Sequence, residues 1–249
     1  KQAEQFGTFV ANDTITKVDF SSWPFVLETE SGEKVHALSV VIATGGIMKK
    51  LGIQGEDEYL GKGVAICGIC DAALFKDKEV IVVGGGDAAI QEAMLLAVNA
   101  KKVTLVVAGP KMRATQCMQD RLNEHKNVEV VYNSRVTKIT GDGTQVTGAQ
   151  VTSEIDKISI DYLVSGVFVG IGQTPNTEIF KFQLALDKKG YIKLSGRTQD
   201  ASIPGVFAGG SCCEGRWTQA AVSSGDCIKA ALSAMDFLND HEITDLYLN

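Results

Sequence analysis

The sequence predicts an α/β protein in which one βαβ unit is inserted between two pieces of a second α/β layer. Residues 79–83 form a short, mainly β-branched run that stops at three consecutive glycines. Residues 87–100 then carry apolar side chains at helical spacing, and residues 103–107 form another apolar run. This order of strand, glycine turn, helix and strand predicts the βαβ unit.

Strand-like segments flank this unit in the sequence. Before it, residues 24–46 contain apolar runs broken by Ser31 and Gly32, and we expect a buried strand at 40–43. After it, three segments alternate in polarity as in a hairpin or meander, and they are 128–132, 135–140 and 145–151, with a turn at 141–143. The remaining predicted elements are a buried strand at 163–170, strands at 191–194 and 206–210, a turn at 203–205, and a long amphipathic helix from about 219 to 238.

The overall composition limits the classes of partner. The chain has 249 residues, of which 45% are apolar and 22% charged, as is typical of globular proteins. Its formal net charge of −6 disfavours nucleic acid and anionic membranes as partners. No run reaches the roughly 18 apolar residues of a membrane span, and the first residues show no basic stretch followed by an apolar one, so we expect a soluble, cytoplasmic protein. The chain does not begin with Met, and we expect a further segment to precede it.

The glycine turn fits the pattern G-x-G-x-x-A from Gly84 to Ala89. In this pattern the first glycine permits a tight turn, the second lets the backbone approach a pyrophosphate, and the small last residue lets helix pack on strand. The start of the next helix offers free N–H groups to phosphates. Because the turn lies between a strand and a helix, we interpret it as nucleotide-binding, with a plain structural turn as the alternative.

The identity of the nucleotide is harder to predict. The second strand of such a unit normally ends in an acid for the ribose of NAD, or near basic residues for the 2′-phosphate of NADP. Here the strand leads into Val107, Ala108 and Gly109, and only Lys111 and Arg113 follow. Arg113 is a candidate for a bidentate phosphate contact, and the alternative is a solvated loop charge.

Cys67 and Cys70 form a C-x-x-C motif, which places two thiols one helical turn apart. At a helix start, backbone amides lower the pKa of a thiol and raise the fraction of reactive thiolate. The spacing alone also fits half of a zinc site, or chance. A second pair of zinc ligands is hard to supply, because the three histidines do not stand at ligand spacing and Cys212-Cys213 has the wrong spacing for a zinc loop.

Asp71 directly follows the second cysteine. Thiol–disulfide exchange needs a proton donor for the leaving thiolate, and a carboxyl desolvated beside a flavin would serve. The alternative is an acid that only complements the helix dipole.

These residues together resemble the low-molecular-weight thioredoxin reductase family along nearly the whole chain. The matching segments, in the family's order, are ATGG at 43–46, LGIQGEDEYLGKGVAICGICDAALFKDKEVIVVGGGDAAIQEA at 51–93, MRAT at 112–115, GVFVGIGQTPNTEIF at 166–180, SIPGVFAGGSC at 202–212 and TQAAVSSGD at 218–226.

The resemblance implies two Rossmann-like domains of the three-layer ββα kind. An FAD-binding domain at 1–49 and 173–249, N-terminally truncated here, would be interrupted by an NAD(P)-binding domain at 50–172 that carries the C-x-x-C. The implied chemistry passes a hydride from NADPH, with NADH as the other possible donor, to FAD. Two electrons then pass to the cysteine disulfide and on to thioredoxin or a similar small dithiol protein. A homodimer and a large rotation between the domains are also implied.

The resemblance also implies roles for individual residues. Cys67 and Cys70 are the expected redox pair and Asp71 the expected acid–base residue. The expected nicotinamide-dinucleotide contacts are Gly84, Gly85, Gly86, Asp87, Ala88 and Glu92, to which Arg113 is added as the candidate phosphate contact. The positions expected at FAD are Thr44, Gly45, Gly210, Ser211, Thr218, Gln219 and Ala220. No metal site is expected.

Several departures from the family pattern weaken parts of this transfer. The first βαβ unit of the family, whose glycine turn holds the FAD pyrophosphate, has no counterpart in this sequence. Residues 107–109 replace an H-R-R cluster for the 2′-phosphate, and Thr218 replaces an Arg. Ser211 replaces an Asp, and its hydroxyl can hydrogen-bond the ribityl chain only more weakly than a carboxylate.

Three hypotheses result. The first, which we expect, is an FAD-dependent disulfide reductase that uses NADPH or NADH. The second keeps the fold and the cysteine pair but takes electrons from another donor such as reduced ferredoxin, as the missing basic cluster suggests. The third is a degenerate, non-catalytic reductase fold, which the loss of the Asp and of the N-terminal unit would favour.

Overall fold

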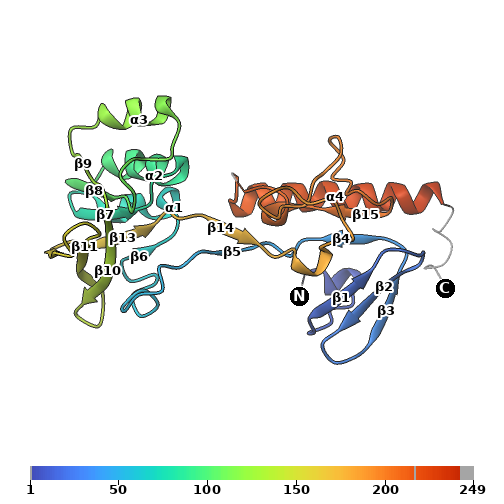
Figure 1. Ribbon diagram of the computed structural model, residues 1–249. Coiled ribbons are helices and arrows are strands. Elements are labelled where there is room, and N and C mark those ends of the chain that lie inside the picture. The colour runs from blue at the N-terminus through green and yellow to red at the C-terminus, as the bar shows by residue number, and fades with distance from the viewer. Residues whose placement is uncertain (1, 216, 242–249) are drawn as a thin grey trace. The chain divides into compact units, whose positions relative to one another are not determined.

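The computed structural model describes residues 2–215 and 217–241. The chain divides into two compact units, one made of Lys1–Ile47 and Thr174–Asn249 and the other of Met48–Gln173 (Figure 1). The chain crosses between the units at β5 (Gly46–Met48) and β14 (Gln173–Pro175), and these two strands pair with each other.

The 48–173 unit is built on a five-stranded parallel sheet. Its strands, in spatial order, are β6 (Val64–Ala65), β13 (Gly166–Val169), β7 (Glu79–Val83), β8 (Lys102–Val106) and β9 (Val128–Val131). The predicted βαβ unit is confirmed, because β7 leads through the glycine turn into α2 (Asp87–Ala97) and then into β8.

Three layers form around this sheet because successive side chains of a strand point to opposite faces. On one face, Val80 and Val82 pack with α2 and with Leu122 of α3 (Gln116–Asn123). On the other face, Ile81 and Val83 pack against an antiparallel meander. The strands of that meander are β10 (Ser134–Gly141), β11 (Val146–Ser153) and β12 (Ser159–Tyr162).

Two predictions for this unit need correction. Residues 128–132 were expected in a hairpin or meander, but β9 is the edge strand of the parallel sheet and pairs with β8. The helix α3 was not predicted, because only Leu122 of its residues is buried and the sequence therefore shows no apolar stripe.

The other unit combines an antiparallel meander with a parallel strand pair and a long helix. The meander consists of β1 (Ile15–Asp19), β2 (Phe25–Thr29) and β3 (Lys34–Ala37), and β4 (Val40–Ile42) pairs in parallel with β15 (Val206–Ala208). The helix α4 (Ala220–Asp240) packs on β15 through Ala230, Ala234 and Phe237. Short 3₁₀ turns complete the fold at Glu4–Phe6, Ala72–Phe75, Glu178–Phe180 and Gly210–Cys212.

Two further predictions are corrected in this unit. Residues 191–194 do not form a strand, since only an isolated bridge joins Ile192 to Leu186. The strand at 40–43 is only partly buried, with Ile42 in the core and Val41 38% exposed. The long C-terminal helix is confirmed, and no helix in the described ranges has the length and apolarity to span a membrane.

Candidate active site

Cys67 and Cys70 are joined by a disulfide at the start of the short helix α1 (Gly68–Asp71). Their Cα atoms lie 5.3 Å apart, and Cys67 is the N-cap residue, whose Sγ accepts a hydrogen bond from the backbone N–H of Cys70 at 3.3 Å. Cys70 is exposed and Cys67 is half-buried. Within the described residues no group of three or more His, Cys, Asp or Glu side chains stands close enough to hold a metal.

Asp71 is the last residue of α1 and is half-buried. Its backbone N–H donates a hydrogen bond to the carbonyl oxygen of Cys67 at 3.2 Å, which closes the turn around the disulfide. Its position next to Cys70 suits a proton donor, and that role stays a prediction.

Glu92 of α2 lies directly beneath this turn. The backbone N–H of Gly68 donates to Glu92 Oε1 at 3.3 Å, while Glu92 Oε2 is buried without a hydrogen-bond partner among the described residues. Burial raises the pKa of Glu92 to about 7, and the Gly68 N–H opposes this rise. The sequence pointed to Glu92 only as part of the nucleotide-binding helix, because no local pattern links residues 68 and 92.

The glycine turn has the close contacts that its motif requires. Gly84 has φ +143°, and a Cβ there would lie 2.5 Å from the carbonyl oxygen of Gly170 and 2.7 Å from Ala89 Cβ. A Cβ on Gly86 would instead meet nothing within 4 Å. The turn is therefore tight on the side of the sheet and open above Gly86, at the start of α2.

The 112–115 segment lies beside this turn. The backbone N–H groups of Arg113 and Ala114 both donate to the carbonyl oxygen of Gly85, at 2.6 and 3.1 Å. Thr115 donates its backbone N–H to Asp87 Oδ1 at 2.9 Å. The side chain of Arg113 is exposed and forms no ion pair within the described part of the chain. The structure thus brings the backbone of Arg113 beside the predicted glycine turn, whereas the carboxyl of Glu92 faces Gly68 and Gly170.

The residues predicted at FAD lie in the other unit, around β4 and the start of α4. The backbone N–H of Gly209 donates to the carbonyl oxygen of Ile42 at 3.0 Å, so that the Gly210–Cys212 turn follows directly beside the end of β4. A Cβ on Gly210 would lie 3.2 Å from Ser223 Cβ of α4. Gln219 is the N-cap of α4, and Thr218 and Ala220 flank it.

Thr44 and Gly45 complete this group. Thr44 Oγ1 donates to the carbonyl oxygen of Asn176 at 2.6 Å, and Asn176 Nδ2 donates back to that of Thr44 at 3.0 Å. Gly45 has φ +68°, and a Cβ there would meet nothing within 4 Å. The turn is therefore fixed by its neighbours and open at Gly45.

Two free cysteines, Cys212 and Cys213, lie next to this group. Their Sγ atoms are 3.6 Å apart, Cys212 is fully buried, and its thiol donates to the carbonyl oxygen of Gly209 at 3.2 Å. A hydrogen bond from the Cys213 thiol lowers the pKa of Cys212 to about 7, and the same contact raises the pKa of Cys213.

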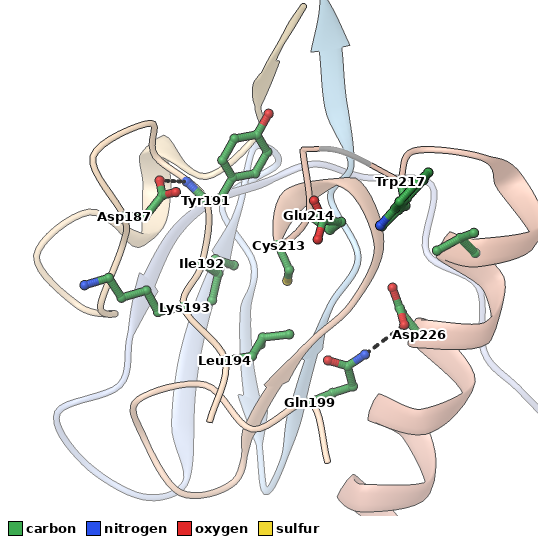
Figure 2. Close-up of a pocket in the computed structure, with 11 residues that line it drawn as sticks. Asp187, Tyr191, Ile192, Lys193, Leu194, Gln199, Cys213, Glu214, Trp217 and Asp226 are labelled. Carbon is green, nitrogen blue, oxygen red and sulfur yellow. Dashed lines mark hydrogen bonds between the residues drawn. The ribbon is translucent and has the colours of Figure 1, made fainter. Parts of the chain in front are cut away.

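A cavity of about 560 Å³ opens in the same unit between the 187–199 segment and α4 (Figure 2). Tyr191, Cys213 and Trp217 contribute to its wall, and Gln199 donates to Asp226 Oδ1 at 3.0 Å across it. None of the residues predicted from the sequence as site residues lines this cavity.

Comparison with known proteins identifies the family. Residues 2–226 match the profile of the family described as pyridine nucleotide-disulphide oxidoreductase. The chain is 39% identical over 247 residues to a thioredoxin reductase of Debaryomyces hansenii, covering 97% of this chain and 77% of that protein. It is 38% identical over 244 residues to a thioredoxin reductase of Rickettsia typhi, covering 96% and 77%.

Solved structures agree with this assignment and confirm the predicted fold class. The thioredoxin reductase of Giardia duodenalis superposes with a TM-score of 0.91 at 37% identity, covering 96% of this chain and 78% of that one. The enzyme of Streptococcus pyogenes gives a TM-score of 0.88 at 31% identity, with the same coverage. The protein is a thioredoxin-reductase-like flavoprotein oxidoreductase, and the hypotheses of another electron donor or a non-catalytic fold are not favoured. The chain belongs to the low-molecular-weight thioredoxin reductases of the pyridine nucleotide-disulphide oxidoreductase family.

Proposed function

We propose that this protein reduces the disulfide of thioredoxin, or of a similar small dithiol protein, with electrons that pass from NADPH through FAD to the Cys67–Cys70 pair. The observation that carries the proposal is the disulfide itself, which lies at an accessible helix start in the same unit as an open glycine turn. We assign residues 50–172 to NADPH binding and residues 1–49 and 173–249 to FAD binding.

The nucleotide fits the glycine turn. A Cβ on Gly86 would meet nothing within 4 Å, and the first N–H groups of α2 are available to a pyrophosphate at this point, which supports the proposal. Asp87, Ala88 and Glu92 belong to this helix. The guanidinium of Arg113 is suited to the 2′-phosphate that separates NADPH from NADH. NADH remains the alternative donor because the family's basic cluster is replaced by residues 107–109.

The flavin part of FAD fits the group around Thr44, Gly45 and the start of α4. Gly45 is open to a ligand, and Ser211, Thr218, Gln219 and Ala220 supply hydroxyl, amide and backbone groups. When bound, FAD converts the two-electron hydride of the nucleotide into electrons for a disulfide.

The cysteine pair then performs thiol–disulfide exchange. Reduction breaks the Cys67–Cys70 bond and leaves a thiol and a thiolate, and helix-start amides favour the thiolate form. The thiolate attacks the partner disulfide and forms a mixed disulfide, which the second cysteine resolves. Asp71 supplies the proton to the leaving sulfur. We also propose a homodimeric, cytoplasmic enzyme, as the family resemblance implies.

Anaerobic flavin spectroscopy tests this function. The protein is loaded with FAD, and NADPH, NADH or reduced ferredoxin is added in separate samples. Bleaching of the flavin by NADPH, followed by turnover of thioredoxin disulfide, is the expected result. Bleaching by reduced ferredoxin alone, or failure to bind flavin, would overturn the proposal.

A further inference from the structure

Glu92 is in direct contact with residues 67–70, the turn that carries the disulfide and is called the redox turn below. The carboxyl accepts the Gly68 N–H at 3.3 Å, and a Cβ on Gly68 would lie only 3.4–3.6 Å from the Cγ, Cβ and Cα atoms of Glu92. Gly68 lies between the two residues of the redox turn that carry the sulfurs. The backbone between the cysteines therefore packs against the aliphatic part of the Glu92 side chain.

The second oxygen of Glu92 is enclosed on its other side. A Cβ on Gly170, at the end of β13, would lie 3.0 Å from Oε2, which is buried without a hydrogen-bond partner among the described residues. An ionised carboxylate with an unpaired buried oxygen loses hydration that nothing in its surroundings replaces. This agrees with a pKa near 7, which a small change in local charge can move across the physiological range.

The charged groups on the packed elements are engaged elsewhere. Glu79 of β7 pairs with Lys101, Lys102 of β8 pairs with Glu129 of β9, Asp87 of α2 accepts from Thr115, and Asp120 of α3 accepts from Gln116. Asp71 of α1 and Arg121 of α3 are the remaining charges on these elements. None of them is a cause of the shift at Glu92, which comes from burial and the Gly68 N–H alone.

We propose that Glu92 is a positioning residue that takes up a proton when the Cys67–Cys70 disulfide is reduced. This inference rests on the proposed redox function of that disulfide. Two electrons break the S–S bond, one proton converts one sulfur to a thiol, and the other sulfur becomes a thiolate. A second proton neutralises the Glu92 carboxylate. The turn then holds one negative charge in both states, on the carboxylate before reduction and on the thiolate after it, and avoids two adjacent negative charges.

A dithiol titration without flavin or nucleotide tests the proposal. The chain is equilibrated with mixtures of reduced and oxidised dithiothreitol, which supplies both electrons and both protons. Free thiols at 67 and 70 are then alkylated and counted by mass spectrometry. Glu92→Gln keeps an acceptor for the Gly68 N–H but cannot bind a proton. We expect reduction of this variant to be about tenfold more favourable than in the wild type near pH 8, and the two to converge near pH 6.

Glu129→Gln is the matched control. It makes the same carboxyl-to-amide change in the same unit, at an exposed ion pair with Lys102, and is expected to keep the wild-type pH profile. An unchanged pH profile in Glu92→Gln would overturn the proposal.

Infrared difference spectroscopy on the wild type gives a second readout that needs no variant. Above the pKa of Glu92 in the oxidised state, the reduced-minus-oxidised spectrum should gain the carbonyl band of a protonated carboxylic acid. Absence of that band would also contradict the proposal. Because neither experiment uses FAD or NADPH, their outcome is independent of whether the proposed electron path is right.

Discussion

The backbone N–H of Arg113 donates a hydrogen bond to the carbonyl oxygen of Gly85 at 2.6 Å, which fixes the 112–115 segment against the glycine turn. The side chain of Arg113 is exposed at this position, and we propose that its guanidinium contacts the ribose phosphate of a nucleotide bound at the turn. Its charge would be matched by the 2′-phosphate of NADPH, which NADH lacks.

Replacement of this guanidinium should therefore change cofactor preference. We expect Arg113→Gln to raise the KM for NADPH about tenfold through loss of a charge-assisted contact, while the KM for NADH stays the same. Initial rates of flavin-dependent turnover with each nucleotide measure this. Lys111→Gln, in the same exposed loop, is the control. An equal change in the KM for NADPH and the KM for NADH in Arg113→Gln would show that Arg113 does not contact the 2′-phosphate.

Substitutions at two of the three glycines of the turn, Gly84 and Gly86, should separate an effect on stability from an effect on nucleotide binding. Gly84→Ala places a Cβ 2.5 Å from a backbone oxygen at positive φ, and should destabilise the protein by about 3 kcal/mol. Gly86→Ala places a Cβ in open space at φ −97°, and should leave stability unchanged while weakening nucleotide binding. Urea unfolding and nucleotide titration of both variants distinguish these effects. If Gly86→Ala kept full nucleotide affinity, the pyrophosphate would not bind at Gly86.

The buried Glu92 should make stability depend on pH. Its pKa is raised in the folded state, from 4.5 to about 7, so between these values the folded protein keeps a proton that the unfolded chain loses. Stability therefore falls as pH rises through this window, by about 3 kcal/mol from this group, and levels off above it. Glu92→Gln should lose this part of the pH dependence. Urea unfolding from pH 4.5 to pH 8 measures it, and identical slopes in both proteins would contradict the burial argument.

Removal of one sulfur should separate reduction of the flavin by the nucleotide from reduction of the protein disulfide. We expect Cys70→Ser to abolish reduction of a protein disulfide, because no intramolecular disulfide can form, while flavin reduction by the nucleotide continues. Stopped-flow absorbance and a thioredoxin assay follow the two steps. Cys117→Ser removes an exposed free cysteine of the same unit and should change neither. Turnover of a protein disulfide by Cys70→Ser would mean that the exchange chemistry lies elsewhere.

Elements with a strong local pattern could be predicted from the sequence. The run at 79–83, the glycines after it and the apolar periodicity after Asp87 together define β7, the turn and α2, and all three are observed. The 21-residue α4 was equally clear. By contrast, α3 has a polar surface with one buried residue, Leu122, and β9 has the alternation of a meander strand although it pairs in parallel with β8.

Contacts between distant residues could not be predicted in the same way. The approach of Glu92 to Gly68 depends on how α1 packs against α2, and the approach of Gly209 to Ile42 depends on the parallel pairing of β4 with β15. These are tertiary contacts over 24 and 167 residues, and no spacing rule reaches across them. The motif therefore locates the sulfurs, and only the fold shows what surrounds them.

The sulfurs at positions 67 and 70 can be followed directly through one reduction. The FAD-loaded protein is mixed anaerobically with NADPH or NADH, quenched with an alkylating reagent and analysed by mass spectrometry. Both cysteines are expected to change from a disulfide to two alkylated thiols as the flavin is reduced and reoxidised. A flavin that bleaches fully while Cys67 and Cys70 stay joined would rule out the proposed electron path.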